Sequence, residues 1–410
     1  MNPPQKICLI TSIFFPYTRG GAETVVNNIV QGLKERGYQV IVITISPFKG
    51  LGSLWPRKYY HNGIVIYRFF PLNLFSYLNI NRYENLPWLR IIWHGLDMFN
   101  LHSFLMVKHI LKKEKPQIVM THMLKGVGYL TPLAIKLARI KHIHTLHEVQ
   151  LITPSGLILK GKEGSWQHKG ILTRLYQFFT RLLFNSPSIV ISSSKFLSDF
   201  HNSHNFFPYS KKIILTNPII INKTEKEGLK KKQNKLFSFL FLGQIEEHKG
   251  ILLLIKVFKK LKREVGDKLG EFELLIVGQG SAMKKAKTLA GKEESIKFLG
   301  YIPNFELNKI FVQVDVTVVP SLCYENSPTV IFESLSYGIP VLAARIGGIE
   351  FIKDNYNGFT FEAGDADDLL KILKFSLENK DKLKNMSENA KKSVEQIGIG
   401  KYIQKLEKLI

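Results

Sequence analysis

The sequence is poor in cysteine and has no long apolar run. Its two cysteines, Cys8 and Cys323, are too few for a disulfide framework and are typical of a protein of the reducing cytoplasm. No apolar stretch approaches the ~20 residues that span a bilayer. The apolar stretch at residues 6–15 is short and lacks a small-residue cleavage site, so we interpret it as a buried strand rather than a signal peptide.

Acidic residues are scarce in the first half of the chain. Residues 1–220 hold 26 Lys and Arg against 8 Asp and Glu, whereas the remaining residues hold 31 against 25. A general lysine bias would load both halves alike, so the basic half indicates an anionic partner: nucleic acid, an acidic membrane surface or an anionic acceptor. The sequence has no zinc-ligand spacing, recognition-helix signature or RNA-binding aromatic motif, and we therefore expect no nucleic-acid partner.

Strand and helix patterns alternate along all 410 residues, a length sufficient for two domains. In the first half, strand patterns cover 6–15, 40–45, 64–70, 117–121, 141–146 and 188–192, with a helix pattern at 22–36. A polar, basic stretch at 222–234 is interpreted as an interdomain linker. Beyond it, strand patterns at 236–242, 273–277, 296–299 and 315–319 alternate with helix patterns at 251–263 and from 281. The alternation predicts an α/β fold with two Rossmann-like, doubly wound parallel sheets.

Residues 324–348 carry the most informative pattern. They predict a helix with Ser327 as N-cap, Pro328 as first residue and Gly338 just past its end, followed by a buried strand at 339–343. The strand pattern at 315–319 leads into this segment. The helix start should therefore lie at the carboxyl end of a parallel sheet, where open α/β folds bind ligands.

Two carboxylates, Glu325 and Glu333, bracket this helix start. Free amides at Thr329 and Val330 can hold a phosphate, and the carboxylates can accept hydrogen bonds from sugar hydroxyls. An ordinary α/β helix explains the capping residues and the glycine. It does not explain two carboxylates beside an anion-binding helix start.

The segment Glu-Asn-Ser-Pro-Thr-Val-Ile-x-Glu, followed by Gly-x-Pro-Val, resembles the retaining glycosyltransferases of the GT-B fold, specifically glycosyltransferase family four (glycosyl transferases group 1). The resemblance implies two Rossmann-like domains facing across a cleft. Residues 1–221 would bind the acceptor, and residues 235–397 would bind the nucleotide-sugar. It also implies that a last helix, residues 398–410, crosses back to the first domain.

The resemblance further implies a reaction and roles for single residues. A sugar would move from a nucleotide-sugar to an acceptor hydroxyl with retention of anomeric configuration. Glu333 would hold the ribose, the amides near Thr329 the diphosphate, and the loop at Tyr301 the base, while catalytic Glu325 would meet the sugar hydroxyls. The implied donor-binding residues are Gly21, Gln244, Lys249, Tyr301, Asn326, Ser327, Thr329, Val330 and Glu333.

Two glycine-containing loops extend the match. Gly20-Gly21 separates the first strand from the first helix, and a tight turn alone would explain the pair. The resemblance places Gly21 against donor and acceptor and Gly20 at the cleft. The loop at 243–250 matches the family's Gly-Arg-x4-Lys-Gly motif, so Lys249 would meet the diphosphate. Gln244 departs from the usual Arg and brings no charge, which shifts diphosphate binding toward Lys249 and the helix amides.

Histidines gather in the segment Lys-His-Ile-His-Thr-Leu-His-Glu at residues 141–148. On a strand, His142 and His144 share a face, and His147 falls at the carboxyl end. No carboxylate or thiol completes a convincing metal set with them. The resemblance assigns His147 as the active-site histidine that touches the donor sugar. His122, at another strand end, would line the cleft.

We expect no cofactor, because the nucleotide-sugar is itself a substrate. We also expect no metal ion, because the resemblance implies that cationic side chains and helix amides stabilise the leaving group instead. Neither Gly20-Gly21 nor Gly278-Gln279-Gly280 has the third glycine of a dinucleotide fingerprint, which disfavours an NAD enzyme. Asp365-Ala366-Asp367 has the same Asp-x-Asp spacing as the metal-binding motif of other glycosyltransferases. Its place ahead of an apolar helix pattern instead predicts that it caps that helix.

The expected partners are a nucleotide-sugar, a lipid-linked acceptor and an anionic membrane surface, with the protein at the cytoplasmic face of the membrane. The helix pattern at 171–184, rich in Leu and Phe, suits either a membrane surface or core packing. The expected role is synthesis of a cell-surface polysaccharide or glycolipid. A nucleotide-sugar epimerase or phosphorylase of the same fold is the alternative, and a basic nucleic-acid-binding protein is a more distant one.

Overall fold

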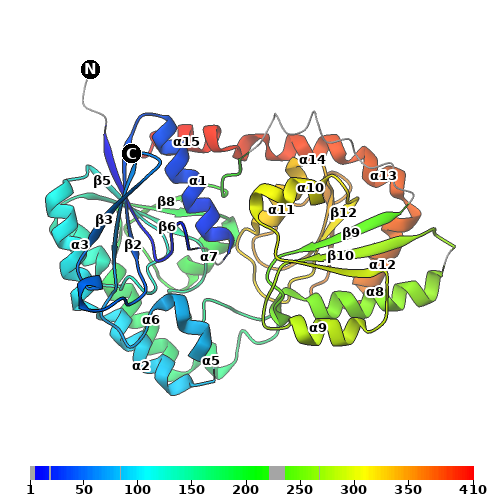
Figure 1. The fold of residues 1–410 in the computed structure, drawn as a ribbon, viewed down its shortest axis with the longest axis horizontal. Helices are drawn as coiled ribbons and strands as arrows, with labels where there is room; N and C mark the ends of the chain where they lie inside the picture. Colours follow the sequence, from blue (N-terminus) through cyan, green and yellow to red (C-terminus); the bar gives the residue numbers. More distant parts are fainter. Residues whose placement is uncertain (1–4, 18–19, 84, 221–235, 267) are drawn as a thin grey trace. The chain divides into compact units, whose positions relative to one another are not determined.

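The structure is a computed structural model that describes residues 5–17, 20–83, 85–220, 236–266 and 268–410. These residues form two α/β units (Figure 1). Unit 1 runs from the N-terminus to Leu157 and adds Gly164–Pro218 and Ile399–Ile410, whereas unit 2 comprises Ile158–Glu163 and Ile219–Gly398. The expected linker at 222–234 lies outside the described residues. Residues 158–163, expected in the first domain, belong to unit 2.

Unit 1 is built on an eight-stranded sheet in the order β3-β4-β2-β1-β5-β6-β7-β8. Its neighbouring strands run parallel except for the antiparallel pair β3 and β4. The central strands β1, β5 and β7 are almost wholly buried, as expected for short apolar runs in a sheet covered on both faces. The strands are β1 (Lys6–Ile10), β2 (Gln39–Ile45), β3 (Arg57–His61), β4 (Ile64–Phe69), β5 (Ile118–Thr121), β6 (Lys141–Leu146), β7 (Ile189–Ser192) and β8 (Lys211–Ile214).

The last helix packs on the first helix of unit 1. A Cβ added at Gly32 would lie 2.8 Å from the side chains of Ile399 and Ile403, so the absence of a side chain at this position lets the two helices approach closely. The helices of unit 1 are α1 (Gly21–Glu35), α2 (Pro87–Met98), α3 (Leu101–Glu114), α4 (Thr131–Leu137), α5 (Trp166–Lys169), α6 (Ile171–Phe184), α7 (Lys195–Ser203) and α15 (Ile399–Glu407), with 3-10 turns η1 (Leu51–Ser53) and η2 (Tyr77–Tyr83).

Unit 2 is built on a six-stranded sheet in the order β11-β10-β9-β12-β13-β14, with all neighbours parallel. Its strands are β9 (Phe237–Leu242), β10 (Phe272–Val277), β11 (Ile296–Gly300), β12 (Val316–Val319), β13 (Val341–Ala344) and β14 (Gly358–Phe361). Its helices are α8 (Ile251–Val265), α9 (Met283–Ala290), α10 (Leu307–Phe311), α11 (Thr329–Ser336), α12 (Ala366–Glu378), α13 (Lys380–Asn385) and α14 (Ser387–Val394), with 3-10 turns η4 (Glu247–Lys249), η5 (Asn304–Glu306) and η6 (Glu395–Ile397).

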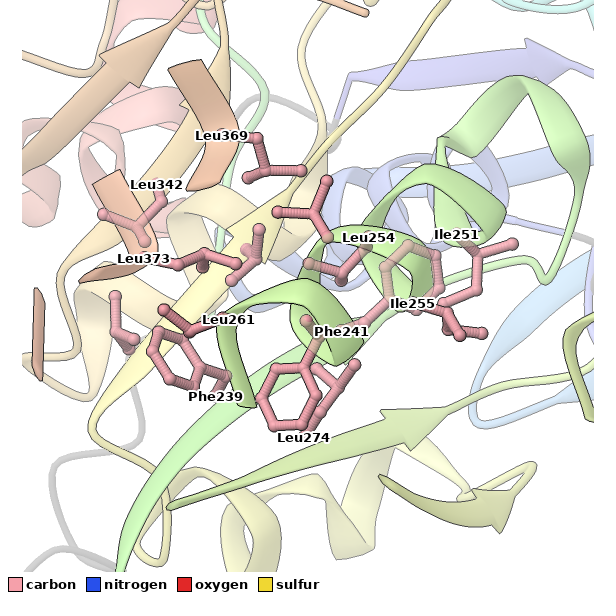
Figure 2. Close-up of a cluster of buried hydrophobic side chains, with 14 of the residues drawn as sticks. Phe239, Phe241, Ile251, Leu254, Ile255, Leu261, Leu274, Leu342, Leu369 and Leu373 are labelled. Carbon is pink, nitrogen blue, oxygen red and sulfur yellow. The ribbon is translucent and has the colours of Figure 1, made fainter. Parts of the chain in front are cut away.

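A large buried cluster anchors α8 and α12 to the sheet of unit 2 (Figure 2). Phe239 and Phe241 project from β9, Leu254 and Leu261 from α8, and Leu373 from α12. Each such side chain contributes about 2 kcal/mol on burial. This cluster makes the sheet a rigid support for the loops at its carboxyl edge.

The sequence predicted most strand positions to within two residues but not every boundary. The first strand, expected over 6–15, ends at Ile10. The strands that were not predicted are β3, β8 and β14, and the helices that were not predicted are α2, α3, α4, α5, α7, α10, α13 and α14. Among the described residues, the structure contains no helix long and apolar enough to cross a membrane.

Candidate active site

The strand order of unit 2 reverses between β9 and β12, the position at which open α/β sheets bind ligands. The chain runs outward from β9 through β10 to β11, and then returns to the other side of β9 with β12. At such a reversal the connections leave the carboxyl ends in opposite directions, which opens a crevice there. Lys249 lies on the loop that follows β9, and Glu325 lies on the segment that follows β12.

Lys249 and Glu325 meet in this crevice. The Lys249 ammonium donates to Oε1 of Glu325 over 2.6 Å, and the hydroxyl of Ser321 donates to the same oxygen over 2.6 Å. Burial opposes ionisation of both groups. The opposite charge of its partner nevertheless raises the pKa of Lys249, and Lys249 together with Ser321 lowers the pKa of Glu325. Both side chains are therefore charged at neutral pH.

Two glycines let the loops approach closely enough for this pairing. A Cβ at Gly250 (φ +76°) would lie 1.8 Å from the carbonyl oxygen of Pro320, and one at Gly347 (φ +72°) would lie 2.1 Å from that of Glu325. The amide of Gly348 donates to the Glu325 carbonyl over 2.6 Å. Glycine is required at both positions because any side chain would overlap backbone atoms.

Helix α11 begins at Thr329, with Pro328 as its N-cap and no side-chain capping bond. The prediction of Ser327 as N-cap and Pro328 as first helical residue is therefore wrong by one residue. Pro328 has ψ 119°, an extended value that keeps it out of the helix. The first-turn amides at Thr329 and Val330 have no intrahelical partner and carry the positive end of the helix dipole.

Glu333 lies one turn into α11 and is partly buried. Burial raises its pKa to about 7, against a smaller opposing effect of the Thr329 hydroxyl. At neutral pH its carboxyl group can thus switch between a neutral donor and a charged acceptor.

This pKa makes the stability of the protein depend on pH. Because the folded state holds the proton more tightly than the unfolded chain, Glu333 stabilises the fold most below its unfolded pKa of about 4.5. That contribution, about 3 kcal/mol, is lost as pH rises toward 7. Denaturant unfolding of the wild type and Glu333→Gln should therefore show the variant gaining relative stability between pH 5 and pH 8. A constant difference would show that the carboxyl group titrates normally.

A segment distant in sequence completes the surroundings of Glu325. Residues 158–163 pair with the chain just before it: the amide of Lys160 donates to the Leu322 carbonyl over 2.9 Å, and the amide of Tyr324 donates to the Ile158 carbonyl over 3.0 Å. The Lys160 ammonium pairs with Glu362 and donates to the Ala363 carbonyl over 2.9 Å. Sequence reasoning missed this contact, since six residues without a periodic pattern carry no signal of a distant partner.

The other expected donor-binding residues also lie at the carboxyl edge of this sheet. Gln244 is exposed on the loop that carries Lys249, and Tyr301 is exposed immediately after β11, the edge strand. Asn326 and Ser327 are half-buried between Glu325 and α11. The structure thus pairs Lys249 with Glu325, which lies on the segment leading into α11, and it places Tyr301 two strands away from β9.

In unit 1 the expected residues follow strands β1, β5 and β6. Gly20 and Gly21 open α1, where the amide of Gly20 donates to the Glu23 carboxylate over 2.9 Å. His122 and His147 follow β5 and β6, and Nδ1 of His122 lies 2.9 Å from Nε2 of His147. A cavity of about 20 Å³ beside them has room for about one water molecule.

The two histidines are neutral at physiological pH. Burial lowers the pKa of His147 to about 4, and burial together with the charge of His147 lowers the pKa of His122. In a neutral pair one ring donates to the other, so His122 fixes the ring orientation of His147.

His142 and His144 have a different role from this pair. Both rings bind the hydroxyl of Thr121, over 2.7 Å and 2.8 Å, and both are buried. Burial lowers the pKa of His142 to about 3. Within the described ranges no three His, Cys, Asp or Glu side chains are arranged to hold a metal ion.

The predicted capping role of Asp365 is confirmed: its side chain accepts from the amides of Asp367 and Asp368 at the start of α12.

Two Rossmann-like units, with a glutamate, a lysine and a helix start at the switch point of the second, define a GT-B glycosyltransferase. Comparison with known families agrees. Residues 19–222 match the model of Glycosyltransferase Family 4, and residues 222–393 match that of Glycosyl transferases group 1. The chain belongs to this glycosyltransferase family.

Individual relatives cover most of the chain. It is 26% identical to an uncharacterised 42.6 kDa protein in the cps region of Klebsiella pneumoniae, over 84% of this chain and 86% of the relative. It is also 26% identical to the UDP-Gal:alpha-D-GlcNAc-diphosphoundecaprenol alpha-1,3-galactosyltransferase of Escherichia coli, over 76% and 79%. Among solved structures, sucrose-phosphate synthase from Thermosynechococcus elongatus matches with a TM-score of 0.73 at 16% identity, covering 99% of this chain and 98% of that one. HepE of Anabaena in complex with UDP matches with 0.68 at 16%, covering 99% of both chains.

Proposed function

We propose that this protein transfers a sugar from a nucleotide-sugar to an acceptor hydroxyl, with retention of anomeric configuration and without a metal ion. The observation that carries the proposal is the Lys249–Glu325 pair beside the start of α11. A cation and free helix amides can hold a diphosphate, and an ionised carboxylate can hold sugar hydroxyls. HepE, a protein of the same fold, was crystallised with UDP, which supports a nucleotide donor.

In this reaction the bond between the anomeric carbon and the phosphate oxygen breaks, and the acceptor oxygen bonds to the same face of that carbon. The acceptor's proton passes to the leaving phosphate. Lys249 and the amides of Thr329 and Val330 take up the negative charge that develops on the diphosphate. Glu325 holds the sugar hydroxyls, and Glu333 holds the ribose. The family resemblance assigns His147 to the donor sugar as well. Positioning and charge stabilisation then replace a nucleophilic side chain.

We further propose that the acceptor is lipid-linked and that the reaction takes place at the cytoplasmic face of a membrane. The Escherichia coli relative is named for a diphosphoundecaprenol-linked acceptor, and the Klebsiella relative for a cps region. Both names fit synthesis of a cell-surface polysaccharide or glycolipid. The basic first half of the chain also suits an anionic membrane surface.

A panel of UDP-, GDP- and ADP-sugars tests the proposal. We expect one nucleotide to raise the melting temperature, and its sugar to pass to a short-chain polyprenyl-diphosphate-linked acceptor in the presence of EDTA. Nuclear magnetic resonance of the product should show the donor's anomeric configuration. Formation of an isomerised nucleotide-sugar without acceptor would instead identify an epimerase, and loss of transfer in EDTA would contradict the absence of a metal.

A further inference from the structure

Helix α2 exposes a stripe of apolar side chains, although it also buries Trp93 and Met98. Its solvent-facing stripe consists of Trp88, Ile91, Ile92, Leu96 and Phe99, at the spacing of one helical face, and Trp88 is 60% exposed. The same helix buries the carboxyl group of Asp97, which accepts from the Gly126 amide over 2.9 Å. A surface helix of a globular protein normally presents charged and polar side chains to solvent instead.

Helix α6 also exposes large apolar side chains. It exposes Leu175, Phe178 and Leu182, of which Leu182 is 63% exposed. On its inner side the hydroxyl groups of Tyr176 and Thr180 donate to the carbonyls of Gln150 and Leu151, each over 2.7 Å. Polar contacts thus hold much of the inner side of the helix, where Phe184 is also buried, while the three apolar residues on the outer side remain in solvent.

The two apolar stripes are joined. The ring of Phe99, at the end of α2, packs edge-on against Phe179 of α6, with ring centres 5.3 Å apart, and the two helices are drawn close to each other in Figure 1. We define the α2–α6 face as the exposed residues Trp88, Ile91, Ile92, Leu96, Phe99, Ile171, Leu172, Leu175, Phe178 and Leu182. Large apolar side chains exposed in this number on neighbouring helices of a folded protein mark an interaction site.

The charges around this face have one sign. Lys169 and Arg174 are exposed on α5 and α6, and Lys136 is exposed on neighbouring α4. Helices α2 to α6, which the structure describes throughout, contain two acidic residues. Asp97 is 2% exposed, and Glu114 pairs with Lys6 and Lys58. The helices that carry the face therefore combine exposed apolar side chains with basic neighbours, and their own two acidic residues are buried or paired.

We propose that the α2–α6 face docks on an anionic phospholipid surface, with its apolar side chains among the acyl chains and its basic rim at the headgroups. Apolar insertion combined with basic charge is the recognised mode of interfacial helices. A second copy of this chain is a poorer occupant, because a symmetric contact would bring two basic rims together. This inference rests on the proposed function in one respect: the proposed function places a lipid-linked acceptor at that surface.

Sedimentation of the full chain with vesicles tests this inference. We expect binding to phosphatidylcholine mixed with phosphatidylglycerol and much weaker binding to phosphatidylcholine alone. The double variants W88S/I92S and L175S/F178S should each lower binding by about tenfold or more, since each removes two inserting side chains. The matched control Y209S/I214S removes two exposed apolar side chains outside the face, around edge strand β8, and should bind like wild type. Arg174→Glu should weaken binding to the anionic vesicles only.

The readouts separate failure of this inference from failure of the proposed function. Face variants that bind like wild type, equal binding to both vesicle types, or a control that loses as much binding would each overturn the docking face. A wild-type dimer that the face variants convert to monomer would also overturn it, in favour of self-association. If the face variants lose vesicle binding while the wild type transfers no sugar from any donor, the docking face stands and the transferase proposal falls.

Discussion

Glu325→Ala is expected to lower the rate of sugar transfer by about a hundredfold or more, because it removes the carboxylate proposed to hold the donor sugar. Lys249→Ala should weaken nucleoside diphosphate binding by about tenfold to a hundredfold, the effect of one lost charge-assisted hydrogen bond. Calorimetry with the nucleotide and initial-rate kinetics measure the two effects. Glu325→Gln keeps an acceptor for Ser321 and Lys249, and it isolates the contribution of charge.

Glu325→Ala can also lower activity by destabilising the fold, so its effects on stability and on sugar transfer must be measured separately. Glu325→Ala leaves the partly buried Lys249 ammonium without its partner, which can cost about 3 kcal/mol of stability. Unfolding curves of both single variants and of the double variant measure that coupling. Lys285→Ala breaks a matched but exposed pair with Glu247 in the same unit and should leave transfer unchanged. If Glu325→Ala and Lys285→Ala transfer sugar equally well, Glu325 is not in the active site.

Much of the arrangement around Glu325 was predictable from sequence. Lys249 and Glu325 each follow a strand pattern, and parallel strands deliver their carboxyl ends to one edge, so their proximity follows from the strand order. The direct pairing over 2.6 Å was not predicted. The pairing depends on close backbone contacts at Gly250 and Gly347, between loops that are distant in sequence. A sequence motif specifies residue types but does not specify such contacts.

The sequence could not decide which side of α6 faces inward. A 3.6-residue period separates an apolar side from a polar one, and burial of the apolar side is the usual outcome. In α6 the hydroxyl groups of Tyr176 and Thr180 find carbonyl acceptors inside unit 1, which makes burial of the polar side favourable. Those acceptors belong to a loop, residues 150–151, whose position only the folded structure supplies.

Gly250→Ala is expected to destabilise the protein by about 3 kcal/mol or more and to abolish sugar transfer. The new methyl group would lie 1.8 Å from the Pro320 carbonyl oxygen, so either the loop that carries Lys249 or the segment that carries Glu325 must move. The left-handed backbone, φ +76°, adds about 1 kcal/mol. Denaturant unfolding and steady-state kinetics of the purified variant measure both effects.

Gly266→Ala provides the matched control in the same unit. Gly266 also has a positive φ, +51°, and with its ψ of −135° this backbone conformation costs an alanine about 1–3 kcal/mol. An added Cβ would meet no atom within 4 Å, so the backbone cost alone applies. Any excess destabilisation of Gly250→Ala, whose left-handed backbone costs about 1 kcal/mol, is therefore a lower limit for the cost of the close approach at Pro320. Equal destabilisation would show that the two loops do not approach as closely as the structure places them. Full transfer activity in a folded Gly250→Ala protein would show that the spacing of Lys249 and Glu325 does not control the reaction.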